Sequence, residues 1–208
     1  LSNTFGANRV RLAEFGLADQ VVEINRRGAA ISKRAAGDKA FVFASLGPSG
    51  KMLVAGDVTE DELLAAYTEQ AKALAEGGAD AIVIETMAEL EEVKLALAAV
   101  QAANLPAVTC MVFDTGGRTM MGVSPEQAAQ ELTTAGADVI GANCGSGIAQ
   151  YIDICRQLRR ATNLPIWIKA NAGIPEMIND KPVWKTSPAE FASHVPALLE
   201  AGAADRKS

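Results

Sequence analysis

The sequence lacks several features that would assign it to familiar classes of protein. It has no run of roughly 18 apolar residues that could cross a membrane, and no cluster of basic residues. Its formal net charge of -6 argues against a nucleic-acid partner. Three cysteines, Cys110, Cys144 and Cys155, are too few and too scattered for a disulfide framework, and no secretory signal peptide is apparent. We therefore expect a cytoplasmic protein with reduced thiols that binds neither a membrane nor a nucleic acid.

The sequence contains a single histidine, His194. This residue falls in a stretch that predicts a helix surface, beside Ser193 and far from the end of any predicted strand. A serine–histidine–acid triad needs its histidine within hydrogen-bonding distance of both partners. The sequence therefore excludes that kind of nucleophilic catalysis, and we assign His194 no role.

What the sequence does contain is a series of short apolar runs. Hydrophobic residues make up 49% of the 208 residues, which is enough for a sizeable core in one domain covering residues 1–208. Six runs are apolar almost throughout rather than alternating, as is typical of strands buried on both faces of a parallel sheet. We predict strands at residues 1–5, 40–46, 81–86, 107–113, 139–144 and 166–171.

Each run is followed by residues with helical periodicity, and several helix starts are well marked. Thr59 and Glu62 form a capping box, in which hydroxyl and carboxylate bond the first free backbone amides of a helix. Ser124 and Ser187 each precede a proline suited to the first helical turn. A loose repeat is also present, because Gly-Ala-Asp turns lead into two of the strands and a similar turn begins a third unit, at residues 78–80, 136–138 and 202–204.

Alternating strands and helices with short turns indicate an α/β fold with a parallel sheet. A TIM-type (β/α)8 barrel has eight such units, whereas about six are present here. We interpret the chain as an incomplete barrel whose first and last strands are missing, and we expect it to be part of a longer protein. An open, doubly wound sheet is the alternative.

Active sites of parallel α/β folds collect at the carboxyl ends of the strands. At these ends the apolar runs stop at polar residues, which include Thr4, Ser45, Glu85, Thr86, Asp114, Asn143, Cys144 and Asn171. We expect them to lie on one rim. Such a rim predicts a small-molecule site with an acid, amides and a thiol.

Three of these rim residues have competing interpretations. Cys144 could be a nucleophile or a soft metal ligand, or a small buried residue that ends a strand. Glu85 ends an otherwise apolar strand, so its carboxylate must face a ligand or be paired in a helix cap or a salt bridge. Asn171 could line a site or simply form a tight turn. We predict that Cys110 and Cys155 lie in the core.

Six separate segments, taken in order, resemble the homocysteine S-methyltransferase family. Each segment is moderately specific, and together they cover nearly the whole chain: 3–8 (NTFGAN), 47–50 (GPSG), 85–86 (ET), 114 with 117–119 (D and GRT), 141–144 (GANC) and 171–175 (NAGIP). The sequence is most similar to the homocysteine-binding domain of cobalamin-dependent methionine synthase. Relatives that use betaine or S-methylmethionine look more distant.

The resemblance implies an enzyme that transfers a methyl group to the thiol of homocysteine, giving methionine. It implies that Glu85, Asn171, Thr4 and Asn143 bind the substrate, with Glu85 receiving the ammonium group, and that Cys144 is the first of three zinc-binding cysteines. The methyl carrier would be a cobalamin or a folate on another domain. The family's other two cysteines form a Gly-Gly-Cys-Cys-Gly turn that this sequence lacks. Because one thiolate cannot hold zinc as three can, we expect this chain to bind zinc weakly or not at all.

Two other functions stay open. The loop at residues 145–147 (GSG) could cradle a phosphate on its backbone amides, as in a pterin- or phosphate-binding barrel. The absent cysteines would also suit a non-catalytic remnant that binds a small amino acid.

Overall fold

The computed structural model describes residues 1–204, and its centre is a five-stranded parallel sheet. The strands lie side by side in the order in which they occur in the chain: β1 (Phe43–Leu46), β2 (Ala81–Met87), β3 (Ala107–Met111), β4 (Val139–Cys144) and β5 (Ile166–Ala170). All four neighbouring pairs are parallel. Five of the six predicted strands are therefore confirmed.

The predicted strand at residues 1–5 is wrong. The segment does run beside β1, where the amide of Ser2 donates to the carbonyl of Phe43 (3.2 Å). After this bond, side chains replace the backbone ladder: the amide of Ser45 donates to Ser2 Oγ (3.1 Å), and Thr4 Oγ1 donates to the carbonyl of Ser45 (2.6 Å). Hydroxyl groups that satisfy a neighbouring backbone in this way compete with regular strand pairing.

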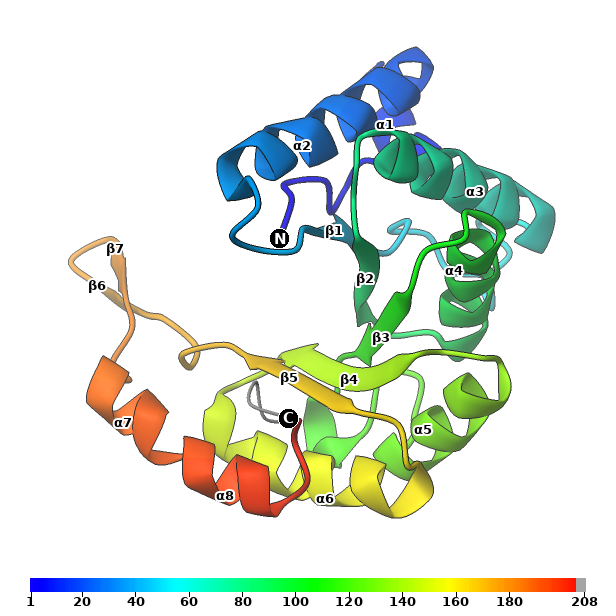
Figure 1. The fold of residues 1–208 in the computed structure, drawn as a ribbon. Helices are drawn as coiled ribbons and strands as arrows, with labels where there is room; N and C mark the ends of the chain where they lie inside the picture. Colours follow the sequence, from blue (N-terminus) through cyan, green and yellow to red (C-terminus); the bar gives the residue numbers. More distant parts are fainter. Residues whose placement is uncertain (205–208) are drawn as a thin grey trace.

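Helices connect the strands and lie along the outer side of the sheet (Figure 1). They are α1 (Arg9–Ala13), α2 (Val21–Ala36), α3 (Glu60–Glu76), α4 (Leu90–Ala102), α5 (Pro125–Thr134), α6 (Tyr151–Ala161), α7 (Pro188–Ser193) and α8 (Val195–Glu200). The capping box at Thr59 and the serine caps at Ser124 and Ser187 are confirmed, because each hydroxyl accepts the amide three residues further on. Among residues 1–204, none of the helices is long and apolar enough to cross a membrane.

The sheet is strongly curved. Phe43 on β1 and Trp167 on β5, at its two edges, stack with ring centroids 5.8 Å apart. In a flat sheet, four strand spacings of roughly 4.8 Å would separate these edges by about 19 Å. The edges therefore bend toward each other over a concave face, where Val83, Val108 and Cys110 form a small core of strand residues. A wall of this curvature, with the described helices on its outer side, is typical of a barrel and not of a doubly wound sheet.

The turns at residues 78–80 and 136–138, which repeat in the sequence, make the same pair of hydrogen bonds to a neighbouring segment. The amide of Asp80 donates to the carbonyl of Val42 (2.8 Å), and its Oδ2 accepts the amide of Val42 (2.6 Å). Asp138 makes the same two bonds to Ala107, at 3.2 and 2.8 Å. Ala204 bonds the first residue of β5 through its amide (3.0 Å) but has no carboxylate. The prediction that no strand follows this third turn falls on residues 205–208, outside the described residues, and the absence of two barrel strands stays a prediction.

After β5 the chain forms an antiparallel hairpin, β6 (Glu176–Ile178) and β7 (Lys181–Val183), in a stretch for which no strand is predicted. Its two turn residues, Asn179 and Asp180, have positive φ angles of 52° and 60°. Positive φ at both central residues is the requirement of a type I′ turn, and asparagine and aspartate tolerate it well. The two residues together were therefore a hairpin signature that could have been read from the sequence.

Candidate active site

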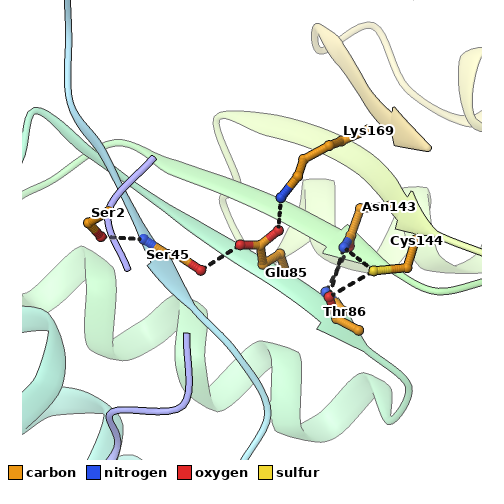
Figure 2. A network of polar contacts seen from close by, with 7 residues as sticks. All are labelled: Ser2, Ser45, Glu85, Thr86, Asn143, Cys144 and Lys169. Carbon is orange, nitrogen blue, oxygen red and sulfur yellow. Dashed lines mark hydrogen bonds and ion pairs between the residues drawn. The ribbon is translucent and has the colours of Figure 1, made fainter. Parts of the chain in front are cut away.

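Polar residues from β2, β4 and β5 meet at the carboxyl end of the sheet, beside a cavity of about 570 Å³. The cavity is lined by Thr86, Val112, Asp114, Cys144, Gly145, Ser146, Asn171 and Ile174. Figure 2 shows a polar network of two groups, in which Glu85 contacts Ser45 and Lys169 while Thr86 contacts Asn143 and Cys144. The two groups adjoin because Glu85 and Thr86 are consecutive residues of β2. The prediction that Glu85 and Cys144 lie on the same rim is therefore confirmed.

Glu85 is the buried acid of this network. Its side chain is 6% exposed, on the concave face of β2, and both of its carboxylate oxygens are bonded. Oε1 accepts a hydrogen bond from Ser45 Oγ and Oε2 accepts one from Lys169 Nζ, both at 2.5 Å (Figure 2). Ser45 is itself held by the bond from its amide to Ser2 Oγ. A buried carboxylate is stable only with such partners, and here they also fix its direction.

Thr86, next along β2, is held in an unusual backbone conformation. Its φ is 65°, which is a genuine outlier for a β-branched residue. The pairing of β2 with β3 shifts register between Ile84 and Met87, so Thr86 lies in a bulge. Asn143 on β4 holds it there, because the amide of Thr86 donates to Asn143 Oδ1 and Asn143 Nδ2 donates to Thr86 Oγ1, both at 2.7 Å. Strain that is fixed by neighbouring strands in this way is typical of functional sites.

Cys144 also has a positive φ, 66°, at the end of β4. Its sulfur lies 3.1 Å from Asn143 Nδ2, which donates to it, and 3.5 Å from Thr86 Oγ1. Asn171 fixes the backbone on the other side: its amide donates to the carbonyl of Cys144 (3.0 Å) and its Nδ2 donates to the carbonyl of Gly145 (3.1 Å). Glu85, Asn143, Cys144 and Asn171 are thus brought together as the sequence predicts, and their roles in binding stay predictions.

Thr4 lies apart from the cavity. It is buried, and its hydroxyl bonds the carbonyl of Ser45 and Ser2 Oγ (2.7 Å). Its methyl group packs on α2, so closely that a Cβ on Gly28 would lie 2.5 Å from Thr4 Cγ2. Thr4 therefore supports Ser45, and through it Glu85, from behind the sheet edge. Its role in substrate binding stays a prediction.

Lys169 is the site residue that sequence reasoning missed. It lies on β5 opposite Asn143 of β4, with a side chain that is 44% exposed. The apolar run at residues 166–170 contains one charged residue, just as the run of β2 contains Glu85. The single charge in an otherwise apolar run was the signal in the sequence, but it did not identify Glu85 as the partner, because Lys169 is exposed on a strand that is mostly half-buried.

The glycine-rich loop at residues 145–147 is folded onto the start of α6. Ser146 Oγ donates to Gln150 Oε1 (2.7 Å), so its hydroxyl is used within the protein. Gly145 has a φ of 68°, and a Cβ there would collide with Gln150 Nε2 and lie 2.9 Å from the hydroxyl of Tyr151. Close packing therefore explains this glycine without a bound phosphate. Burial, and after it the charge of Cys144, raises the pKa of Tyr151.

The three cysteines do not gather into a metal site. Cys110 is fully buried on β3, and burial, followed by the charge of Glu85, raises its pKa. Cys155 is buried on α6, where burial raises its pKa to about 11. The predicted core positions of both are confirmed. Within residues 1–204, no group of three or more histidine, cysteine, aspartate or glutamate side chains could hold a metal ion. The described residues therefore do not fit a three-cysteine zinc site.

The curated proteins that are similar to this chain in sequence include two mycobacterial methionine synthases. The methionine synthase of Mycobacterium tuberculosis is 31% identical over 186 residues, which are 84% of this chain and 16% of that protein. The methionine synthase of Mycobacterium leprae is 30% identical over 210 residues, covering 95% of this chain and 17% of that protein. The chain thus spans about a sixth of the length of the curated relatives it matches.

Solved structures and a family model extend this likeness over almost the whole chain. The homocysteine methyltransferase MmuM from Escherichia coli, in its metallated form, matches with a TM-score of 0.77 and 18% identity over 97% of this chain and 71% of that one. The carboxyl transferase domain of Rhizobium etli pyruvate carboxylase matches with a TM-score of 0.56 and 18% identity over 86% of this chain and 28% of that one. At these identities the likeness concerns the fold alone. The model of the homocysteine S-methyltransferase family matches residues 1–205, and the chain therefore belongs to that family.

Proposed function

We propose that this chain is the homocysteine-binding part of a larger, methionine synthase-type enzyme, in which homocysteine is methylated on sulfur to give methionine. The observation that carries the proposal is the buried carboxylate of Glu85 at the rim, one residue before Thr86, which lines the cavity. A buried acid that is directed by Ser45 is suited to receive the ammonium group of an amino acid. The family to which the chain belongs supports homocysteine as that amino acid.

The polar contacts suggest how the substrate would lie. Its ammonium group would bind Glu85, and its thiol would point along the cavity toward Cys144, between Asn143 and Asn171. Asn143 and Asn171 hold the backbone of this rim, so they would fix the distance between the two ends of the site. A thiol that is held in a fixed direction reacts at high effective concentration.

In the reaction, the thiol of homocysteine loses its proton, and an electron pair of the sulfur forms a bond to the methyl carbon. The bond between that carbon and its carrier breaks, and the carrier keeps the electron pair. We propose a cobalamin or folate carrier on another part of the protein, which the greater length of the curated relatives supports. A zinc site would need two thiolates in addition to Cys144, and the described residues do not place them beside it. No step of the reaction is therefore assigned to zinc.

The test is the affinity of the protein for L-homocysteine, measured by calorimetric titration. We expect Glu85→Gln to weaken binding roughly 10- to 100-fold, because a charge-assisted hydrogen bond is worth about 1.5–3 kcal/mol. Glu131→Gln is a matched control, since Glu131 is also 2.5 Å from a lysine nitrogen, that of Lys94, but lies on the helical side of the sheet. Equal affinities of Glu85→Gln and the wild-type protein would remove Glu85 from the site.

A second measurement separates the enzyme from a non-catalytic remnant. Methionine formation from homocysteine and methylcobalamin is expected for the enzyme. A remnant would bind homocysteine, with the same dependence on Glu85, and form no methionine.

A further inference from the structure

Lys169 is a charged residue of the site that the proposed function does not yet use. Its ammonium group occupies the Glu85 oxygen that a substrate ammonium would need. Glu85 cannot easily move, because it is buried and held by Ser45. Lys169 can, because its side chain is 44% exposed and its four-carbon stem is flexible. Substrate binding would therefore displace Lys169 from Glu85.

The balance of charges determines which group Lys169 would contact after this displacement. An incoming ammonium at Glu85 would leave two cations beside one buried carboxylate, which is unfavourable where water is scarce. An α-amino acid, however, carries its own carboxylate on the carbon that bears the ammonium group. If that carboxylate meets Lys169, negative and positive groups alternate from Glu85 through the substrate to Lys169, and no charge is left unpaired.

The side chains that line the neighbouring cavity favour the same orientation. The residues that line the cavity include an acid, Asp114, and no lysine or arginine. A substrate carboxylate placed against Asp114 would be repelled. Lys169 lies opposite Asn143 in the register of β4 and β5, and its ammonium group bonds Glu85, one residue before Thr86, which lines the cavity (Figure 2).

We propose that Lys169 binds the α-carboxylate of the substrate and so makes the site specific for free α-amino acids. This inference rests on the proposed function, which supplies homocysteine as the ligand. Glu85 and Lys169 act as a preformed pair that opens around the amino acid, one residue taking each of its charged groups. Amines without a carboxylate, and peptides in which the carboxylate is blocked, would bind poorly.

The test compares two ligands of one protein by calorimetric titration. L-homocysteine has the carboxylate, and its decarboxylated analogue aminopropanethiol does not. We expect Lys169→Met to weaken homocysteine binding roughly 10- to 100-fold and to leave aminopropanethiol binding equal or tighter. Lys169→Arg should keep most of the preference for homocysteine. Lys94→Met is the matched control, because Lys94 is paired with Glu131 at the same distance of 2.5 Å outside the site.

The outcomes separate this inference from the proposed function. The result is a ratio of two affinities in one sample, so partial unfolding of a variant cannot produce it. Homocysteine binding that depends on Glu85 but is equal or tighter in Lys169→Met would show that Lys169 only blocks the site, and would overturn this inference alone. A wild-type protein that binds no homocysteine would overturn the proposed function and this inference together.

Discussion

Gly141, in the middle of β4, tests whether the site depends on the close pairing of β4 with β5. Gly141 lies opposite Trp167 in the register of the two strands. A Cβ at this position would collide with the carbonyl oxygen of Trp167 and would lie 2.7 Å from Cys110 Sγ, which is fully buried. Because one of these obstacles is backbone, Gly141→Ala must push β5 away rather than rotate a side chain. The displacement would reach Lys169, two residues further along β5.

The magnitude follows from the packing. Overpacking a core typically costs about 1–3 kcal/mol, and a collision with backbone belongs at the upper end of that range. For a chain of this size, about 3 kcal/mol lowers Tm by roughly 6–12 °C. Circular dichroism during heating and in urea measures both quantities. Gly6→Ala is the control, since a Cβ at Gly6 would meet only the side chain of Arg11, at 3.4 Å.

A Gly141→Ala variant as stable as Gly6→Ala would refute this reasoning. It would show that β5 shifts at no cost, and that the distance from Lys169 to Glu85 is not set by strand pairing. If the reasoning is right, the variant also binds homocysteine more weakly, even at temperatures where it is fully folded.

Two further predictions concern stability. Asn143→Ala removes both hydrogen bonds that hold Thr86 at a positive φ. The free energy of unfolding in urea should therefore fall by about 2 kcal/mol. An unchanged free energy would show that the bulge at Thr86 does not need Asn143. The pKa of Asp80 is lowered from 3.8, first by its hydrogen bond with Lys33 and then by that with the amide of Val42. A lowered folded-state pKa stabilises the protein above the unfolded value, and the stabilisation is lost as pH falls through the folded value. Asp80→Asn should therefore be less stable than the wild-type protein at about pH 7, and the difference in free energy of unfolding should narrow as pH falls below about 4. A difference that does not narrow in acid would contradict the assignment.

Much of the fold could be predicted because its determinants are local. Continuous apolar runs indicated β1 to β5, and the caps at Thr59, Ser124 and Ser187 marked helix starts that depend on residues only three positions apart. The segment at residues 1–5 (LSNTF) differs from these runs because three of its five residues are polar, and its conformation depends on hydroxyl bonds to Ser45, about 40 residues away. No local pattern could reveal those bonds.

The site likewise contains some features that the sequence could predict and others that depend on residues far apart in the chain. Strand ends placed Glu85, Asn143 and Cys144 on one rim, because the carboxyl ends of parallel strands share an edge. The pairing of Lys169 with Glu85 joins residues 84 positions apart, and the bulge at Thr86 depends on Asn143, 57 positions away. The curvature of the sheet brings these residues together, and that curvature is a property of the whole fold.

The stack of Phe43 on Trp167 makes this curvature visible to spectroscopy. The chain has two tryptophans, and the other, Trp184, is 53% exposed. Replacing Trp184 with phenylalanine would leave Trp167 as the single indole fluorophore, lodged between the two edges of the sheet. If the edges separate, the indole ring enters water and its emission moves to longer wavelength. The fluorescence of Trp167 therefore reports the curvature of the sheet. A ligand that changes this curvature would change the emission wavelength, without an added label.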